Sequence, residues 1–245
     1  MAQKKKPRAP QPPRKVQAPK QRTGTPGGPR TVGSRVWLYV AGGVAALVVL
    51  ALIGFFALGS SGGTGEKQVA SLMSAAGCNF KTVTAYVPPG QGVHVKSLTK
   101  KFPWNTDPPS NGQHYPVWAV WGFYTQPVNP RMVVHNEEHG GVILWWGTDV
   151  PGSTVEQLRA FYSEQPDGTF GTPYPKLGGK VAISAWTGDP AKYGSNNYFG
   201  QGHLAICPRV DAATLKAFDA FRKAYRGHGP EGIPLSLDEP GMGPQ

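Results

Sequence analysis

The chemistry that this sequence offers is concentrated in its histidines. All six lie after residue 90, and four of them fall close together in the chain, at His94, His114, His135 and His139. Imidazole is the commonest protein ligand for zinc, copper and nickel. His135 and His139 are four residues apart, so their side chains meet on one face of a helical turn or close on one ion in a loop. The set of four predicts a metal site, and nitrogen-rich ligands favour copper or zinc.

The neighbouring residues could complete such a site. Glu137 and Glu138 lie between the last two histidines, where a carboxylate could bind the ion, orient a histidine or deprotonate a bound water. The segment 107–116 contains two prolines and an Asn-Gly pair, which predict a rigid turn that holds His114 and Tyr115 in place. Taken singly, each histidine is better explained by a buried hydrogen bond, and the segment 107–116 equally well by a plain turn.

Residues 135–139 also fit H-x-x-E-H, the inverted zinc-peptidase motif. That chemistry needs a helix longer than one turn, whereas three β-type residues precede the motif here and two glycines follow it. We therefore interpret 132–147 as a strand or buried extended run. A metal-dependent hydrolase, with Glu137 or Glu138 as the base, remains an alternative function. A second alternative is an accessory structural subunit of an envelope or respiratory complex.

The N-terminal part of the chain has a different composition. The first 35 residues carry ten of the 25 Lys and Arg, seven Pro and no acidic residue, which predicts a disordered tail. Residues 36–58 carry no charge and are long enough to cross a bilayer as one helix. The positive charges before this segment predict a cytoplasmic N-terminus and an outer C-terminal domain at the cell membrane. A cleaved secretory signal is less consistent with so long a basic region.

The charge distribution also bears on partners. A basic tail near a membrane could contact anionic lipid headgroups. The remaining residues are almost neutral, with fifteen basic and fourteen acidic side chains, so we expect no nucleic-acid partner. An envelope protein complex is a possible partner.

The two cysteines, Cys78 and Cys207, both follow the predicted membrane segment. The outer compartment is oxidising, so a disulfide between them is expected. Two separate buried thiols, or a metal bound by both, remain open alternatives, although the sequence has no CxxC spacing.

The outer part of the chain predicts one compact α+β domain. Gly and Ser at 59–65 predict a flexible linker, and the domain follows at 66–245. Helical spacing occurs at 66–76, 154–164 and 211–225, which gives two or three helices. Runs rich in Val and aromatic residues, separated by Pro and Gly, predict a mostly antiparallel sheet. The strand-like runs are KTVTAYV, VHVKS, PVWAVWGFYT, KVAISAWT and GHLAICP, together with the run that contains HNEEH.

Four segments of this domain resemble motifs of the bacterial DUF3105 family: DPPSNGQHYP, HNEEHGGVILWW, AISAW and YRGHGPEG. The resemblance extends from about residue 66 to 235 and places all four clustered histidines and Glu138 at motif positions. Asn111 and Glu137 depart from the usual residues, but no histidine is lost. The family has no known function. The resemblance therefore implies an envelope-facing domain behind one membrane helix and strengthens the metal hypothesis, without indicating an activity.

Overall fold

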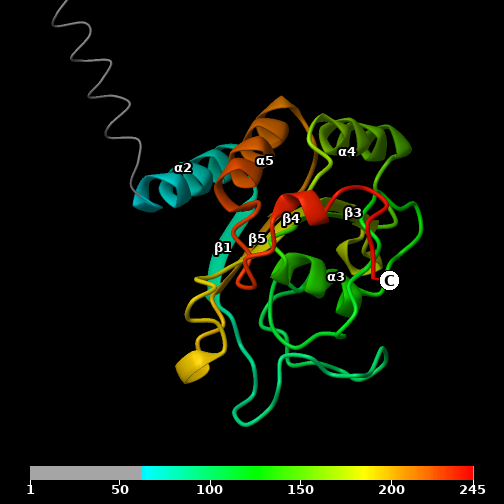
Figure 1. Ribbon diagram of the computed structural model, residues 1–245. Coiled ribbons are helices and arrows are strands. Elements are labelled where there is room, and N and C mark those ends of the chain that lie inside the picture. The colour runs from blue at the N-terminus through cyan, green and yellow to red at the C-terminus, as the bar shows by residue number, and fades with distance from the viewer. Residues whose placement is uncertain (1–61, 245) are drawn as a thin grey trace, which may run out of the picture. The chain divides into compact units, whose positions relative to one another are not determined.

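A five-stranded sheet runs through the middle of residues 62–244, the part of the chain that the computed structural model describes (Figure 1). Its strand order is β1-β5-β4-β2-β3, and neighbouring strands are antiparallel except for the parallel pair β2 and β3. The predicted α+β fold with a mostly antiparallel sheet is thus confirmed. The strands are β1 (Asn79–Thr84), β2 (Val142–Trp146), β3 (Thr169–Pro173), β4 (Val181–Thr187) and β5 (Gln201–Cys207).

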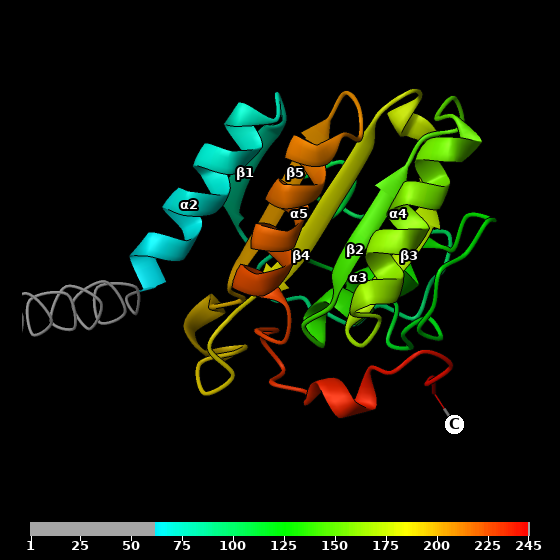
Figure 2. The ribbon, with the colours of Figure 1, turned by 90° about the horizontal axis from the view of Figure 1, so that it is seen from above.

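The helices divide between the two faces of the sheet. Helices α2 (Gly62–Ala75), α4 (Gly152–Glu164) and α5 (Ala212–Tyr225) cover one face, here called the helix side (Figure 2). Helix α3 (Pro130–Glu138) lies on the opposite face together with long irregular segments, here called the loop side. Short 3-10 turns occur at Pro175–Leu177, Ser195–Asn197 and Leu235–Leu237.

Strand β2 shows how the two faces share one core. Val142, Leu144 and Trp146 pack among the helices, whereas Ile143 and Trp145 pack on the loop side. This alternation follows from the two-residue period of a strand. Because both faces are covered, all five residues of the strand are buried and apolar.

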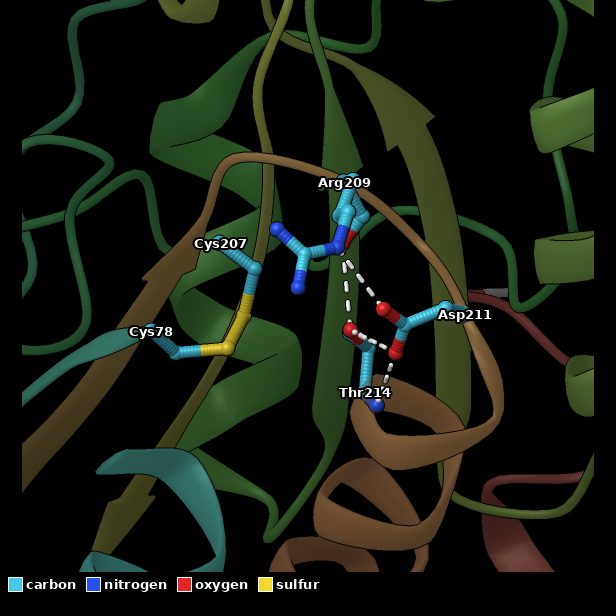
Figure 3. The surroundings of a disulfide bond; sticks show 5 residues. All are labelled: Cys78, Cys207, Arg209, Asp211 and Thr214. Atoms are coloured by element: carbon cyan, nitrogen blue, oxygen red, sulfur yellow. Dashed lines mark hydrogen bonds and ion pairs between the residues drawn. A yellow bond between two sulfur atoms is a disulfide. The ribbon is translucent and has the colours of Figure 1, made fainter. Parts of the chain in front are cut away.

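A disulfide joins the beginning and the late part of the domain. Cys78 directly precedes β1 and is bonded to Cys207 at the end of β5, which is the neighbouring strand. The predicted disulfide is therefore confirmed. Figure 3 shows the bond beside the turn into α5, where Asp211 accepts hydrogen bonds from the Arg209 side chain and from the backbone N–H of Thr214. Asp211 thereby caps the helix, as its sequence position indicates.

The interpretation of 132–147 as one strand or extended run is wrong in its first half. Residues 130–138 form α3, because the Asn129 side chain caps the helix and Pro130 suits its first turn. The structure therefore contains four α-helices in the described part of the chain, one more than the largest number predicted.

The predicted strands in 93–97 and 116–125 are also wrong. These segments form only isolated bridges, between His94 and His114 and between Phe123 and Gly171. Strand β3 was not predicted, because its sequence, TFGTP, contains a glycine and ends in a proline. The glycine is required by packing, since a Cβ on Gly171 would lie 2.3 Å from the Phe123 ring.

The predicted tail at 1–35 and membrane helix at 36–58 lie outside the described residues. Among residues 62–244, no helix combines the length and the apolar character needed to cross a bilayer. Helix α2 begins at Gly62, earlier than its predicted start at residue 66.

Candidate metal centre

Helix α3 presents its ionisable residues in different directions. His135 and Glu138 are three positions apart and so lie on the same side of the helix, while Glu137 is turned by about 100° from Glu138. The helix ends at once after Glu138, where Gly140 adopts a φ of +110° and donates its N–H to the carbonyl of Glu137. A Cβ at Gly140 would lie 2.9 Å from the backbone nitrogen of Gly229, so a later segment of the chain packs directly against this turn.

His94 and His114 come from the irregular segment between β1 and α3. Two backbone hydrogen bonds hold them side by side: Val95 N–H donates to the His114 carbonyl at 2.8 Å, and His114 N–H donates to Val93 at 3.0 Å. Gly112 adopts a φ of +98° in the predicted turn, and a Cβ there would lie 2.8 Å from the Tyr86 carbonyl oxygen. The turn therefore requires glycine, and it fixes the backbone that carries His114.

Three histidines converge on one carboxylate oxygen. Glu138 Oε2 lies 3.1 Å from His94 Nε2, 3.0 Å from His114 Nε2 and 3.7 Å from His135 Nε2. The three ring centroids form an almost equilateral triangle with sides of 4.8, 4.9 and 5.0 Å. A tetrahedral zinc ion with bonds of 2.0–2.1 Å separates its ligand atoms by about 3.3 Å. We call His94, His114, His135 and Glu138 the inner group. Its dimensions could hold a metal ion.

Backbone carbonyls orient two of these imidazoles. His114 Nδ1 donates to the Gly112 carbonyl at 2.8 Å, and His135 Nδ1 donates to the Tyr115 carbonyl at 3.0 Å. A carbonyl oxygen only accepts, so the Nδ1 of each ring carries a proton. A neutral His135 ring therefore has its lone pair on Nε2. The Nε2 atoms of both rings point toward the carboxylate, and that of His114 is hydrogen-bonded to it. Hydrogen bonds of this kind orient the histidine ligands of metal sites.

The charges of the inner group follow from burial and from its partners. Burial by itself raises the pKa of Glu138, but the His114 and His94 imidazoles and the Tyr193 hydroxyl outweigh it and hold the pKa below its usual range. Burial lowers the pKa of His135 to about 3, so this ring is neutral at physiological pH. The hydrogen bond with Glu138 raises the pKa of His94, whose side chain is 39% exposed. The group thus combines a buried carboxylate, a neutral imidazole and one solvent-facing ring.

His139 does not join the inner group. It follows the last residue of α3, and its Nε2 lies 3.5 Å from Glu231 Oε2 while its Nδ1 donates to Asp238 Oδ1 at 3.3 Å. His135, His139 and Glu231 offer ligand atoms within 4.8 Å of one another, and we call them the outer group. The structure thus brings together three of the four predicted histidines and assigns the fourth to a neighbouring group.

A pocket of about 530 Å³ opens beside the outer group. Its walls carry both ionisable and apolar side chains, and several come from the C-terminal segment that passes beside α3 (red in Figure 1). The lining residues are Trp118, His135, His139, Glu231, Ile233, Leu237, Met242 and Gly243.

The side chains of Glu137 and Tyr115 do not take part in the inner group, although the sequence suggested both as supporting residues. Glu137 is completely buried against the sheet, where its Oε1 accepts a hydrogen bond from the Ser184 hydroxyl at 2.5 Å. Ser184 in turn accepts one from the Trp145 indole at 2.7 Å. Burial raises the pKa of Glu137 well above its usual range and so favours the neutral form of this carboxyl. Tyr115 contributes its backbone carbonyl, and no side-chain contact, to His135.

A model of the family described as "Protein of unknown function (DUF3105)" matches residues 94–234, which is more than half of the 245 residues. The chain belongs to the DUF3105 family. The matched region of this DUF3105 domain begins at His94 and includes every residue of the inner and outer groups. Searches of curated proteins and of solved structures gave no match.

Three residues that belong to the two groups or hydrogen-bond their members were not predicted as site residues. Tyr193 donates its hydroxyl to Glu138 Oε1 from an exposed loop between β4 and β5, and nothing in its local sequence indicates this contact. Asp238 likewise gives no local signal. Glu231 does have a signal in the sequence, because it belongs to the segment YRGHGPEG, which resembles a DUF3105 motif. Gly229 of the same segment allows close packing. A Cβ on Gly229 would lie 2.3 Å from the Glu138 carbonyl oxygen.

Proposed function

We propose that this DUF3105 domain binds a copper or zinc ion through His94, His114, His135 and Glu138. We further propose that it does so on the outer side of a cell membrane, to which residues 36–58 anchor the chain. The role would be metal binding or handling at the cell surface.

One observation carries the proposal. The lone pair on His135 Nε2 and the carboxylate oxygen Glu138 Oε2 face each other across 3.7 Å, and both side chains are buried. Neither can turn away, because Tyr115 holds the far side of the imidazole and Tyr193 holds the other carboxylate oxygen. Two buried acceptors that face each other are unfavourable unless a donor or a cation lies between them.

The ligand chemistry supports copper or zinc. Three imidazole nitrogens with one carboxylate oxygen are suitable ligands for either ion. A hydrolase has less support, because it needs a base beside a metal-bound water. Glu137 hydrogen-bonds Ser184 on the sheet and so does not face the imidazoles, and Glu138 is itself one of the candidate ligands.

The proposed location rests on the sequence and on one feature of the fold. The basic tail before an uncharged segment of 23 residues supports a cytoplasmic N-terminus. The disulfide between Cys78 and Cys207 fits an oxidising outer compartment.

Elemental analysis tests the metal proposal directly. The full chain, purified in detergent, is incubated with Zn²⁺ or Cu²⁺, freed of excess metal and analysed. We expect about one ion per chain, with loss of the ion in Glu138→Gln and in His114→Ala. His228→Ala is the matched control, because His228 is exposed and lies outside both groups. A wild-type chain that retains no ion, and unfolds identically with and without chelator, would refute metal binding and support a structural role.

A further inference from the structure

The inner and outer groups share one residue, His135, and its ring has one nitrogen lone pair available for a metal ion. Its Nδ1 donates to the Tyr115 carbonyl, so only Nε2 remains for a metal ion. Nε2 can therefore serve the inner group or the outer group, but not both at once. The two groups are therefore two alternative positions for one ion, and they cannot bind two ions at the same time.

The outer group has ligands that should bind a metal ion more weakly than those of the inner group. His139 is oriented by Asp238, which accepts from Nδ1 and leaves the lone pair of Nε2 toward Glu231 Oε2 at 3.5 Å. Asp238 is completely buried, and its Oδ2 has no hydrogen-bond partner among the described residues. A carboxylate behind a histidine in this way is a common support for a metal ligand. Without the shared His135, however, only two ligand atoms remain in the outer group, against three in the inner group.

The two groups also differ in contact with solvent. The side chain of Glu231 is 27% exposed, whereas that of Glu138 is fully buried. The pocket of about 530 Å³ is lined by His135, His139 and Glu231, so an ion in the pocket meets the outer group first. The backbone ties the two groups together, since Glu231 N–H donates to the Glu138 carbonyl at 3.3 Å.

We propose that the outer group is an exchange position, through which a metal ion passes between the pocket and the inner group. The inference rests on the proposed function, because it assumes that the inner group binds an ion. Exchange is a ligand substitution without change of oxidation state: His139 Nε2 and Glu231 Oε2 bind the ion while His135 is still attached. The bonds to Glu138, His94 and His114 then break one at a time. The bonds to His139 and Glu231 replace two of the three that break, and a water from the pocket takes the third position. His135 stays attached, so the ion is never without protein ligands.

The rival route runs over His94, whose side chain is exposed on the inner group itself. The two routes differ in what His139 does. If the ion passes through the outer group, removal of His139 removes a path and slows binding and release equally, which leaves the equilibrium affinity unchanged. If the ion passes over His94, removal of His139 changes neither rate.

The experiment measures Zn²⁺ release from the loaded full chain after mixing with excess chelator, and Zn²⁺ affinity by competition at equilibrium. For His139→Ala and Glu231→Gln we expect release about tenfold slower than in the wild type, with the dissociation constant within about threefold and the same ion content. Glu231→Gln keeps the size of the side chain and guards against a loss of folding. His228→Ala is the control and should release Zn²⁺ at the wild-type rate.

The outcomes separate this inference from the proposed function. Unchanged release in both variants would overturn the exchange position and leave metal binding intact. Loss of the ion in His139→Ala would also overturn it, because His139 would then be a ligand of a single site. A wild-type chain that binds no Zn²⁺ would refute the proposed function, and the exchange position with it.

Discussion

The two sides of the central sheet bury different kinds of side chain. On the helix side, three regular helices enclose a core of apolar residues and the disulfide. On the loop side, one short helix and long irregular segments bury many polar groups beside a second apolar cluster. The buried polar groups of the loop side include Ser110, Asn111, His114, His135, Asn136, Glu137 and Glu138.

The difference reflects what each kind of burial requires. Apolar burial has no direction, so regular helices with one apolar face are enough. A buried polar group needs a partner in a defined direction, and irregular backbone supplies such partners. The carbonyls of Gly112 and Tyr115, which hold two imidazoles, both belong to irregular segments. We therefore expect the helix side to determine stability and the loop side to determine binding.

The largest expected effect lies on the helix side. Replacing both cysteines, Cys78→Ala with Cys207→Ala, should lower the free energy of unfolding by about 5 kcal/mol, because the bond closes a long loop in the unfolded chain. Urea unfolding of the full chain measures this change. In the absence of urea, the folded variant should still bind the metal ion as the wild type does. A parallel loss of metal binding would show that the two sides are not separable.

The next effect lies on the loop side and should leave stability intact. Glu138→Gln should weaken metal binding by about 100-fold, since it removes the only carboxylate of the inner group. The metal-free variant should be about as stable as the metal-free wild type, because an amide N–H₂ can donate to the Nε2 lone pair of His135 and so offset the weakened contacts with the other two imidazoles. Chemical unfolding in the presence of chelator checks this. A loss of about 3–5 kcal/mol would instead identify Glu138 as one half of a structural ion pair.

A pH dependence should come from the helix side. His203 stacks on Tyr225 and hydrogen-bonds the hydroxyls of Thr82 and Thr187, with Glu66 as the nearby acid. Burial lowers the pKa of His203 to about 4, so the fold favours the neutral ring. Its contribution is complete above pH 6.5, the ordinary value, and is lost as the pH falls toward 4. The loss should be about 3 kcal/mol.

The measurement compares the free energy of unfolding of the wild type and of His203→Gln between pH 7 and 4, with chelator present. The wild type should lose more stability than the variant over this interval. Equal losses would mean that His203 does not contribute, and that the acid sensitivity belongs to the loop side alone.

The smallest effect contrasts two neighbouring residues of α3. Glu137→Gln should change the free energy of unfolding by less than about 1 kcal/mol, because burial raises the pKa of Glu137 and so favours a neutral group, and the amide has the same size. The ion content should not change. A loss of metal in this variant, comparable with that in Glu138→Gln, would show that Glu137 belongs to the site after all.

Local patterns predicted the regular parts of the fold. The helices at 154–164 and 211–225 and the strands β1, β4 and β5 follow from the spacing of their apolar residues. Helix α3 was missed because Val133 and Val134 favour strands, whereas the cap at Asn129 and burial on the sheet favour the helix. Strand β3 was missed because its own sequence is unfavourable for a strand. It forms because it pairs with β2 in the sheet.

The sequence by itself determined which chemistry is available: clustered histidines beside acids, and two cysteines that can pair. Only the tertiary structure decided which groups meet. One step of about 100° along α3 directs Glu138 toward three imidazoles and Glu137 toward Ser184. His139 lies against Glu231 and Asp238, more than 90 positions later in the chain. Such contacts depend on how distant segments pack, and packing is a property of the whole core rather than of any local pattern.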